Sequence, residues 1–390
     1  MITVTDALDA IFKLVEPLGT EDVPLADAAG RILAQPVTAT RLQPPFAASA
    51  MDGYALNGVE ADPEAMFHVI GESAAGHGFD GQVGPGECVR IFTGAPMPDG
   101  TDRVIIQEDV ERKGDLITLA RALDKGPHVR PAGADFTPGD TIPAPRILSP
   151  ADLALAAAMN VPALTVTRKP VVALLATGDE LVMPGEMPGP DQIIASNAFG
   201  LKALIEANGG HARMLPIARD NAASLRMAFD LASDADLIVT IGGASVGDHD
   251  LVGDVAADMG MEQSFYKVLM RPGKPLMAGR LGDAVMIGLP GNPVSSMVCG
   301  HVFLVPALRA LLGLGTAAAP RKSATLAAPV TANGPREHYM RARVDDDQIT
   351  IFDSQDSALL SVLAQANALA IRPASDPARD AGAQLDYLPI

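Results

Sequence analysis

The sequence predicts a multidomain protein of the α/β plus β class, with a mostly parallel sheet at its centre. Three short apolar runs indicate this sheet: residues 171–176, 236–241 and 284–289. None of them alternates apolar with polar residues, which is typical of strands buried on both faces. Stretches with helical spacing separate the runs, at 198–208, 222–232, 250–259 and 294–312. Strands that alternate with helices favour a parallel sheet covered on both sides.

Each apolar run ends in a turn that is rich in glycine, proline or acidic residues. The turns span 177–180, 242–250 and 290–293. Ligands of parallel sheets bind outside the carboxyl ends of the strands. We therefore expect the three turns to meet at one edge of the sheet and to form a binding site there.

Length and composition limit the class of protein. A chain of 390 residues is long enough for several domains, and a hydrophobic content of 48% excludes a disordered chain. Lys and Arg number 29 against 47 Asp and Glu, which gives a net charge of −18. This charge disfavours nucleic acid and anionic membranes as partners. A polyanionic substrate would need a local cluster of cations or a metal ion.

The cysteines and the N-terminus favour a cytoplasmic protein. Cys88 and Cys299 form no CxxC motif, which excludes a disulfide framework and a thiolate zinc site. The first residues lack the basic and apolar regions of a signal peptide. The apolar stretch 294–312 contains His301 and Arg309, so we expect a buried helix rather than a membrane span.

The N-terminal segment should be helical. Thr5 or Asp6 can cap a first helix. Its apolar face consists of Leu8, Ile11, Phe12 and Val15. A second, short helix should span 25–33. Further along, Ser149 and Pro150 begin a helix at 151–159, which we expect to pack against the N-terminal helices.

Two β-rich domains are expected in addition to the α/β domain. From 43 to 140, proline, glycine and aspartate separate the short β-prone runs 88–92, 103–107 and 116–119. After 320 the chain alternates again, which predicts a small β domain at the end. The expected domains are a split helical domain of 1–42 with 141–170, an inserted domain of 43–140, an α/β domain of 171–315 and a final domain of 320–390.

The turn 242–247 has the sequence Gly-Gly-Ala-Ser-Val-Gly and should expose backbone N–H groups before a helix. Such turns bind phosphate, because glycine lets the backbone approach a ligand and the helix N-terminus is partly positive. The motif matches neither the dinucleotide fingerprint nor the P-loop. A tight turn without a ligand is the alternative interpretation.

Acidic residues follow this turn and also end the neighbouring strand. They are Asp248 and Asp250 in one place and Asp179 and Glu180 in the other. Carboxylates beside a phosphate site predict a divalent cation, and Mg²⁺ held by few protein ligands suits this position. Helix capping explains one such acid, but less readily acids at two adjacent strand ends.

Two further groups of residues suit a binding site. Arg271 and Lys274 lie on a rigid Arg-Pro-Gly-Lys-Pro turn, which suits an oxyanion, with a solvated hairpin turn as the alternative. The turn 290–293, Pro-Gly-Asn-Pro, should start the next helix and shape a pocket wall. Asp52 and Thr93 are each followed by glycine, which is first of all a turn signal.

Together these motifs resemble the molybdopterin molybdenumtransferase family, which includes the gephyrin E domain. The matching strings occur in family order: Ser-Ala-Met-Asp-Gly-Tyr at 49–54, Thr-Gly-Ala-Pro at 93–96, Ala-Thr-Gly-Asp-Glu-Leu at 176–181, Gly-Gly-Ala-Ser-Val-Gly at 242–247, Pro-Gly-Lys-Pro at 272–275 and Gly-Leu-Pro-Gly-Asn-Pro at 288–293. They cover nearly the whole chain. The resemblance implies a split helical domain with a β-rich insertion, a molybdopterin-binding α/β domain and a β-barrel-like tail.

The resemblance also implies an activity and partners. Members take adenylylated molybdopterin and molybdate, release AMP and leave molybdenum on the dithiolene sulfurs, with Mg²⁺ assisting. An elongated homodimer is implied, in which each active site combines one subunit's α/β domain with the other's inserted domain. Transient contact with the adenylyltransferase that supplies the substrate is implied as well.

Roles for single residues follow from the resemblance by position. It implies Asp52, Glu180 and Asp250 as catalytic acids, with Glu180 and Asp250 at the metal. The implied molybdate site consists of Arg271, Lys274, Arg341 and Ser357. The implied substrate-binding residues are Thr93, Ser196, Asn197, Gly242, Gly243, Ser245, Gly247, Pro290, Gly291, Asn292 and Pro293.

Two positions depart from the family pattern. Asp356 precedes Ser357 where members often carry glycine, and it adds negative charge beside an anion site. Ala244 stands where valine is commoner, which is an exchange between apolar residues.

One alternative function is a molybdopterin adenylyltransferase, but stand-alone proteins of that activity share only the α/β domain. A scaffold of the gephyrin E-domain type is the other, although a scaffold has no use for acids at strand ends.

Overall fold

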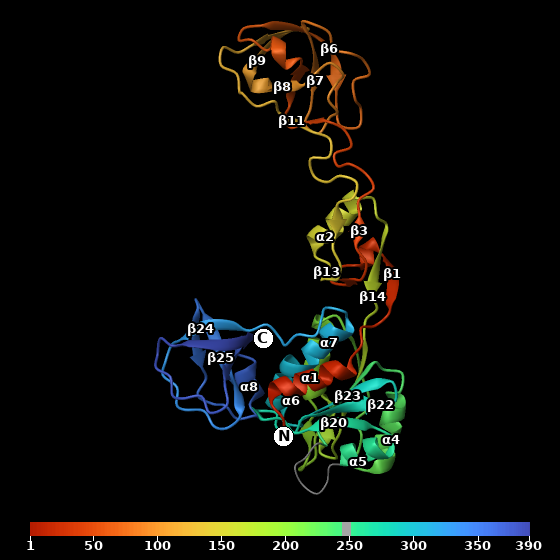
Figure 1. Ribbon diagram of the computed structural model, residues 1–390, viewed down its shortest axis with the longest axis vertical. Coiled ribbons are helices and arrows are strands. Elements are labelled where there is room, and N and C mark those ends of the chain that lie inside the picture. The colour runs from red at the N-terminus through yellow and green to blue at the C-terminus, as the bar shows by residue number, and fades with distance from the viewer. Residues whose placement is uncertain (244–250) are drawn as a thin grey trace.

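The computed structural model describes residues 1–243 and 251–390, and the molecule is elongated. A β domain forms one end, a slender stalk leads from it to an α/β domain, and a β barrel lies beside the α/β domain (Figure 1). Four residues of the sequence-based site, Ser245, Gly247, Asp248 and Asp250, lie outside the described residues.

The α/β domain is built on a six-stranded sheet with the order β18-β15-β19-β23-β22-β20. The strands are β15 (Val171–Ala176), β18 (His211–Met214), β19 (Leu237–Ile241), β20 (Glu262–Tyr266), β22 (Met277–Leu281) and β23 (Ala284–Leu289). The first four in this order are parallel, whereas β22 is antiparallel to both of its neighbours. The prediction of a mostly parallel sheet is confirmed, and the three apolar runs are its adjacent central strands.

Helices cover both faces of this sheet. One face packs on α3 (Asn197–Ala207), α6 (Pro293–Cys299) and α7 (Val305–Leu311), and the other on α4 (Ala222–Leu231) and α5 (Leu251–Asp258). Within β15, Val172 and Leu174 belong to the first core, and Ala173 and Leu175 belong to the second. Because successive side chains point to opposite cores, the strand is apolar throughout.

The most apolar helix is part of the core. It runs through α6, a π-helical turn at Gly300–Leu304, and α7. By length and composition Pro293–Leu311 could cross a membrane, but 78% of its most apolar window is buried inside the protein. Cys299 and Phe303 are completely buried, as expected for a core helix.

The first helix, α1 (Val4–Leu14), is capped by Thr3 and not by the predicted Thr5 or Asp6. The Thr3 hydroxyl accepts a hydrogen bond from Asp6 N at 3.1 Å, and the Asp6 carboxylate accepts one from Thr3 N at 3.2 Å. This reciprocal capping box needs the cap three residues before the acid, which excludes Asp6 itself. Leu8 and Ile11 are buried in the core that α7 shares, so α1 packs on the α/β domain.

The stalk is a four-stranded sheet with the order β1-β14-β2-β13 and one helix, α2 (Pro150–Ala158). The strands are β1 (Thr20–Pro24), β2 (Ile32–Leu33), β13 (Arg146–Ile147) and β14 (Ala163–Thr167). The helix predicted at 25–33 is wrong beyond a short 3-10 turn at Leu25–Asp27, because Gly30 at φ +69° turns the chain into β2. α2 begins at Ser149 as predicted, but it packs in the stalk core with Leu33 rather than on α1.

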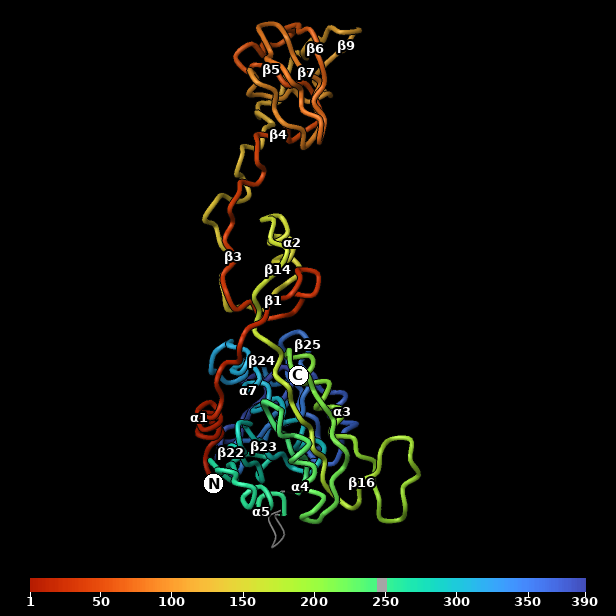
Figure 2. The backbone as a smooth tube through the Cα atoms, turned by 90° about the vertical axis from the view of Figure 1, so that its right-hand side faces the viewer, coloured from red at the N-terminus to blue at the C-terminus, as the bar shows by residue number. Residues whose placement is uncertain are grey.

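The distal β domain contains a six-stranded sheet with the order β8-β5-β7-β6-β10-β9. Its strands are β5 (Gly53–Leu56), β6 (Met66–Ser73), β7 (Glu87–Ile91), β8 (Arg103–Ile106), β9 (Val110–Lys113) and β10 (Leu116–Leu119). The three predicted β-prone runs are β7, β8 and β10. Two antiparallel chain segments connect this domain with the stalk, pairing β3 (Val37–Thr38) with β12 (Thr141–Ile142) and β4 (Ala48–Ser49) with β11 (Val129–Arg130) (Figure 2).

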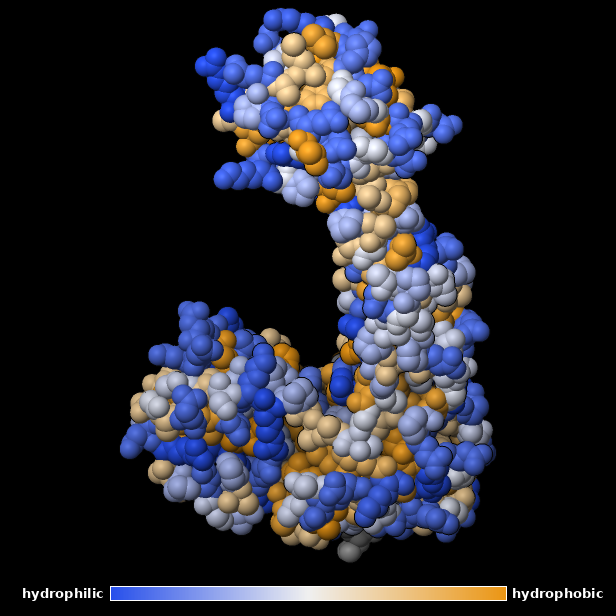
Figure 3. All heavy atoms as spheres, turned by 45° about the horizontal axis from the view of Figure 1, so that its top comes forward, coloured by the Kyte–Doolittle hydropathy of each residue, from blue (hydrophilic) through white to orange (hydrophobic). Residues whose placement is uncertain are grey.

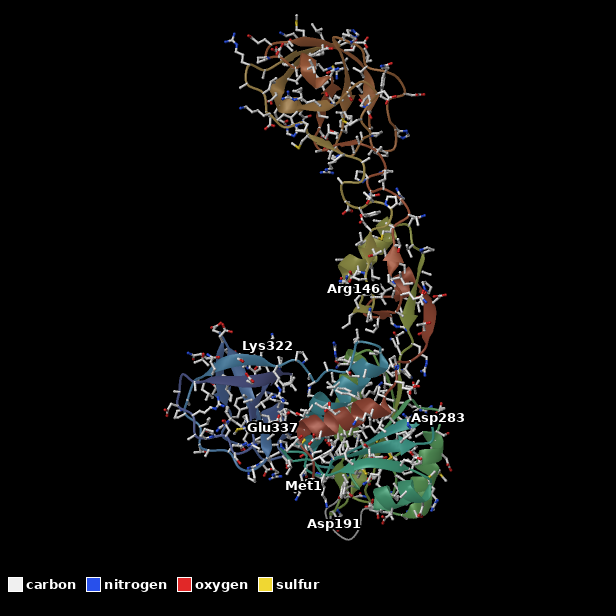
Figure 4. All side chains as sticks on the ribbon, in the orientation of Figure 1. Met1, Arg146, Asp191, Asp283, Lys322 and Glu337 are labelled. Carbon is white, nitrogen blue, oxygen red and sulfur yellow. The ribbon has the colours of Figure 1, made fainter. Side chains whose placement is uncertain are left out.

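The C-terminal strands close into a five-stranded barrel in which β25 pairs with both β26 and β27. The strands are β24 (Lys322–Leu326), β25 (Glu337–Asp345), β26 (Gln348–Ile351), β27 (Ala368–Arg372) and β28 (Gln384–Pro389). The sequence analysis did not identify β28. A short strand of the α/β domain, β21 (Met270–Arg271), also pairs with β25, at the junction where Figure 4 labels Glu337.

Candidate functional site

A cleft of about 1210 Å³ lies where the predicted turns after β15, β19 and β23 meet. Its walls include predicted site residues from all of these turns and from the start of α3: Glu180, Ser196, Asn197, Gly242, Gly243, Pro290, Gly291, Asn292 and Pro293. The strands β16 (Leu181–Val182) and β17 (Ile193–Ile194) border the cleft. Asp191, in the loop between them, lies at the end of the molecule opposite the distal β domain (Figure 4).

Two adjacent glycines allow the close packing of this wall. Gly242 and Gly243 have φ angles of +91° and +70°. A Cβ atom at Gly243 would lie 2.1 Å from Cγ2 of Val252, and one at Gly242 would lie 3.0 Å from the carbonyl oxygen of Thr177. Residues with side chains therefore do not fit, and the backbone of this turn remains open to a ligand.

Thr177 contributes a buried hydroxyl beside these glycines. The residue is 3% exposed, and its Oγ1 has no hydrogen-bond partner within the part of the chain that the structure describes. An unpaired buried hydroxyl costs about 1–3 kcal/mol. A polar ligand in this part of the cleft could remove that cost. Thr177 belongs to one of the matching strings, but the sequence analysis did not single it out.

Asn197 stabilises the turn that forms another wall. Its Nδ2 donates to the carbonyl of Gly291 at 2.7 Å and to Oγ of Ser296 at 3.3 Å. The Ser296 hydroxyl donates in turn to the carbonyl of Pro290. Ser196 Oγ donates to Asn197 Oδ1 at 3.4 Å. Asn197 thus shapes the cleft through the backbone it holds.

Within the described ranges, three carboxylates line the cleft. Glu180 was predicted, whereas Asp220 and Asp254 were not. A Cβ atom at Gly178, which has a φ of +147°, would lie 2.3 Å from Oε2 of Glu180, so glycine leaves room for this carboxylate. Asp220 follows β18, an edge strand that the sequence pattern did not reveal, and its backbone N donates to Oδ1 of Asp179 at 3.3 Å.

These carboxylates fit a loosely held Mg²⁺ ion better than a rigid metal site. Within 1–243 and 251–390, no group of three or more His, Cys, Asp or Glu side chains is placed to hold a metal ion. Mg²⁺ needs only one or two protein carboxylates, because water and phosphate oxygens complete its octahedral shell. Glu180, Asp220 and Asp254 are available for that, and the predicted ligand Asp250 lies outside the described residues.

The predicted molybdate residues border the cleft rather than line it. Pro275 and Ala358 are in the cleft wall, next in sequence to Lys274 and Ser357. The carbonyl of Ser357 accepts a hydrogen bond at 3.0 Å from the backbone N of Val294, in the first turn of α6. This bond holds the barrel segment against the cleft. Among the described residues, neither Arg271 nor Lys274 forms an ion pair.

Arg341 is completely buried beside this border. Its Nη2 donates to the carbonyls of Ser354 and Asp356, at 3.3 and 2.9 Å, whereas Nε and Nη1 have no partner among the residues described. Burial lowers the pKa of Arg341, Asp356 opposes this, and nearby Arg271 adds to the lowering. Buried guanidinium N–H groups without acceptors are rare in folded proteins, so these donors favour an acceptor that the described residues do not supply, such as an anionic ligand or water.

His338 lies beside Arg271 and Arg341, although no role was expected for it from the sequence. The pairing of β21 with β25 places it opposite Arg271. Burial, and then the charges of Arg271 and Arg341, lower the pKa of His338 to about 4, so the imidazole is neutral at pH 7. No sequence signal distinguishes it, because the contact depends on two domains meeting.

The structure brings Asp52 and Thr93 together, but in the distal β domain, far from the cleft of the same chain (Figure 1). Oδ1 of Asp52 accepts from N and Oγ1 of Thr93, each at 2.7 Å. These bonds, the backbone bond first, hold the pKa of Asp52 below its ordinary value. Gly53 starts a strand, where a Cβ atom would lie 1.9 Å from the carbonyl oxygen of Ile105. The glycine is therefore needed because the neighbouring strand approaches it closely.

Three family models together match most of the chain. They are the MoeA N-terminal region (domains I and II) at 2–160, a probable molybdopterin binding domain at 173–310 and the MoeA C-terminal region (domain IV) at 323–390. A molybdopterin molybdenumtransferase of Nostoc is 36% identical over 397 residues, covering 96% of this chain and 90% of the relative. Molybdopterin molybdenumtransferase 2 of Mycobacterium tuberculosis is 35% identical over 379 residues, covering 93% of each.

Solved structures show the same architecture. A molybdopterin biosynthesis MoeA protein of Pyrococcus horikoshii has a TM-score of 0.85 and 28% identity, covering 100% of this chain and 99% of the other. A second structure from this organism has a TM-score of 0.86 at 24% identity, which supports the fold alone. Because these matches extend over every domain and not the α/β domain alone, the chain belongs to the molybdopterin molybdenumtransferase family.

Proposed function

We propose that this protein transfers molybdenum from molybdate to adenylylated molybdopterin, with release of AMP. The observation that carries the proposal is that a glycine turn and two cations, Arg271 and Lys274, which have no ion-pair partner among the described residues, lie at one cleft. Gly242 and Gly243 line the cleft, and Lys274 is adjacent in sequence to a residue that does. A substrate with a phosphoanhydride and a tetrahedral dianion as co-substrate needs both features close together.

The cleft has parts suited to each substrate. The turn at Gly242 and the hydroxyl of Thr177 are suited to the phosphoanhydride, because they offer hydrogen-bonding groups at the end of buried strands. Arg271, Lys274 and Arg341 are suited to molybdate, because their charges have no ion-pair partner among the described residues. We also assign Ser357 to this anion site, on the evidence that its neighbour lines the cleft.

Mg²⁺ would neutralise charge on the phosphoanhydride and on the leaving AMP. Glu180 would hold the ion together with Asp220 or Asp254, which line the same cleft. The resemblance adds Asp250 to this set. We expect Glu180 to matter more than either described aspartate, because it is the one of the three that the resemblance assigns to the metal.

Asp52 would act in the cleft of a second copy of the chain. Its own cleft lies at the other end of the molecule, beyond the stalk (Figure 1). Apolar surface gathers on the concave side of the molecule, where the barrel meets the α/β domain (Figure 3), which is suitable for burial in a homodimer. In this arrangement the ionised carboxylate of Asp52 faces the reacting substrate of the partner.

The substrate implies a donor and a compartment. Adenylylated molybdopterin must come from an adenylyltransferase, so we propose a transient contact with that enzyme. Both cysteines are buried and free, which suits a reducing cytoplasm.

The direct test mixes purified protein with adenylylated molybdopterin, molybdate and Mg²⁺. We expect AMP release and formation of active molybdenum cofactor, both requiring all three components. If the protein instead consumed ATP and formed the adenylylated pterin, it would be an adenylyltransferase. If it did neither but bound a receptor peptide, it would be a scaffold.

A further inference from the structure

Asp52 is held within the distal β domain by a small hydrogen-bond network. Its backbone carbonyl accepts from Gln107 N at 3.0 Å, and its Oδ1 accepts twice from Thr93. Its Oδ2 has no hydrogen-bond partner in the described part of the chain, so this oxygen is available to a substrate. The direction in which Oδ2 points depends on how firmly the surrounding backbone is fixed.

Arg90 connects the two chain segments that carry these contacts. Its Nη1 donates to the carbonyl of Gly53 at 3.1 Å, and its Nη2 donates to Oε1 of Gln107 at 2.8 Å. Gly53 begins β5 directly after Asp52, and Gln107 follows β8. The guanidinium therefore links both strands next to the catalytic aspartate.

Two aromatic rings hold the guanidinium of Arg90 in place. Its central carbon lies 5.1 Å from the ring centre of Tyr54 and 4.8 Å from that of Phe92. Tyr54 is opposite Arg90 in the register of β5 and β7, and Phe92 immediately precedes Thr93. Lysine cannot reproduce this arrangement, because it lacks the planar fork that stacks on rings and binds two acceptors at once.

We propose that Arg90 is a positioning residue that holds the Asp52 carboxylate so that Oδ2 faces the substrate. This inference rests on the proposed function, in which Asp52 reacts in the cleft of a second copy. Arg90 acts through Gly53 and Gln107 and contacts no substrate. Displacement of a catalytic group by about 1 Å can reduce a rate by about a hundredfold, so a bracing residue is kinetically important.

The experiment compares Arg90→Met and Arg90→Lys with a control, Arg112→Met, in the molybdenum insertion assay. Arg112 is an exposed arginine on β9 of the same domain, and its Nε donates to the carbonyl of Gly114 at 2.8 Å. For Arg90→Met we expect kcat to fall about 10- to 100-fold. The KM values for pterin and molybdate should stay within about twofold, because both substrates bind at the cleft of the α/β domain and its border with the barrel, far from Arg90 in the same chain. Arg112→Met should match the wild type.

The pH profile separates positioning from general loss of structure. The positive charge of Arg90 contributes to lowering the pKa of Asp52, after the two bonds from Thr93. Arg90→Met should therefore move the acid limb of kcat to higher pH. Arg90→Lys keeps the positive charge but loses the planar guanidinium. The acid limb of its kcat–pH profile should therefore stay at the wild-type pH, while kcat itself remains low.

Each outcome decides between the proposals. Wild-type kcat in Arg90→Met, while Asp52→Asn is inactive, would overturn the role of Arg90 alone. An equal loss in Arg112→Met would overturn it too, because the effect would then belong to the whole domain. If the wild-type protein releases no AMP, the proposed function itself is wrong. If Arg90→Met does not fold, Arg90→Lys gives the same comparison of kcat with KM.

Discussion

At the scale of single residues, Oδ1 of Asp52 accepts two hydrogen bonds from Thr93, whereas Oδ2 has no partner among the residues that the structure describes. We predict that Asp52→Asn folds normally but does not insert molybdenum. The amide keeps the shape and its oxygen can still accept from Thr93, so the protein should stay folded, with a small loss of stability because a neutral acceptor binds these donors more weakly than a carboxylate. Activity should be lost, because the amide carries no negative charge. Thermal unfolding and AMP release measure the two effects, and a variant with wild-type activity would remove Asp52 from the mechanism.

Lys274 gives the second prediction at this scale. We expect Lys274→Ala to raise the KM for molybdate about 10- to 100-fold, since a charge-assisted hydrogen bond contributes about 1.5–3 kcal/mol. Pterin affinity should change less, because the turn at Gly242 is untouched. Lys322→Ala is the control, since Lys322 is an exposed lysine at the start of β24 on the barrel and has no role in the proposed anion site (Figure 4). A crystal soaked with tungstate adds a direct check: an anomalous peak distant from Arg271 and Lys274 would contradict the assignment.

At the scale of elements, strands that are buried on both faces could be predicted from the sequence, and a partly exposed edge strand could not. The strands β15, β19 and β23 were predictable, because strands covered on both faces must be apolar. The edge strand β18 has the sequence His-Ala-Arg-Met and is only partly buried, so it has no such pattern, and Asp220 beyond it was missed. The helix expected at 25–33 was wrong because pairing of β2 with β14 and β13 outweighs local helical preference.

The turn after β19 gives the prediction at the element scale. We expect Gly243→Ala to destabilise the α/β domain and to abolish pterin binding. A positive φ alone costs an alanine about 1–3 kcal/mol, and here the Cβ atom would also lie 2.1 Å from Val252. Gly260→Ala is the matched control, because its φ is +93° and a Cβ atom there meets nothing within 4 Å. Denaturant unfolding and pterin titration compare them, and equal effects of the two changes would show that the contact with Val252 is unimportant.

At the scale of the whole molecule, the stalk separates two groups of residues that the proposed reaction needs. Asp52 and Thr93 lie at the distal end, and the cleft with Glu180 lies at the other (Figure 1). Sequence motifs could name the members of both groups, and the resemblance implied that they act across a dimer, but the distance between them depends on the paired segments between the stalk and the distal domain. Nor could they reveal that His338 lies opposite Arg271 with Arg341 buried nearby, because this arrangement forms only when β21 joins the barrel.

This separation predicts a homodimer with shared active sites. Light scattering at micromolar concentration should give twice the mass of the 40.3 kDa chain. Asp52→Asn and Glu180→Gln should each be inactive alone, but equal amounts exchanged into mixed dimers should recover about a quarter of wild-type activity. Half of the dimers are then mixed, and each mixed dimer has one of its two sites with both native acids, as two-fold symmetry requires. A quarter of all sites are therefore complete. A monomer in solution, or mixed dimers without activity, would show that Asp52 does not act in the cleft of a partner.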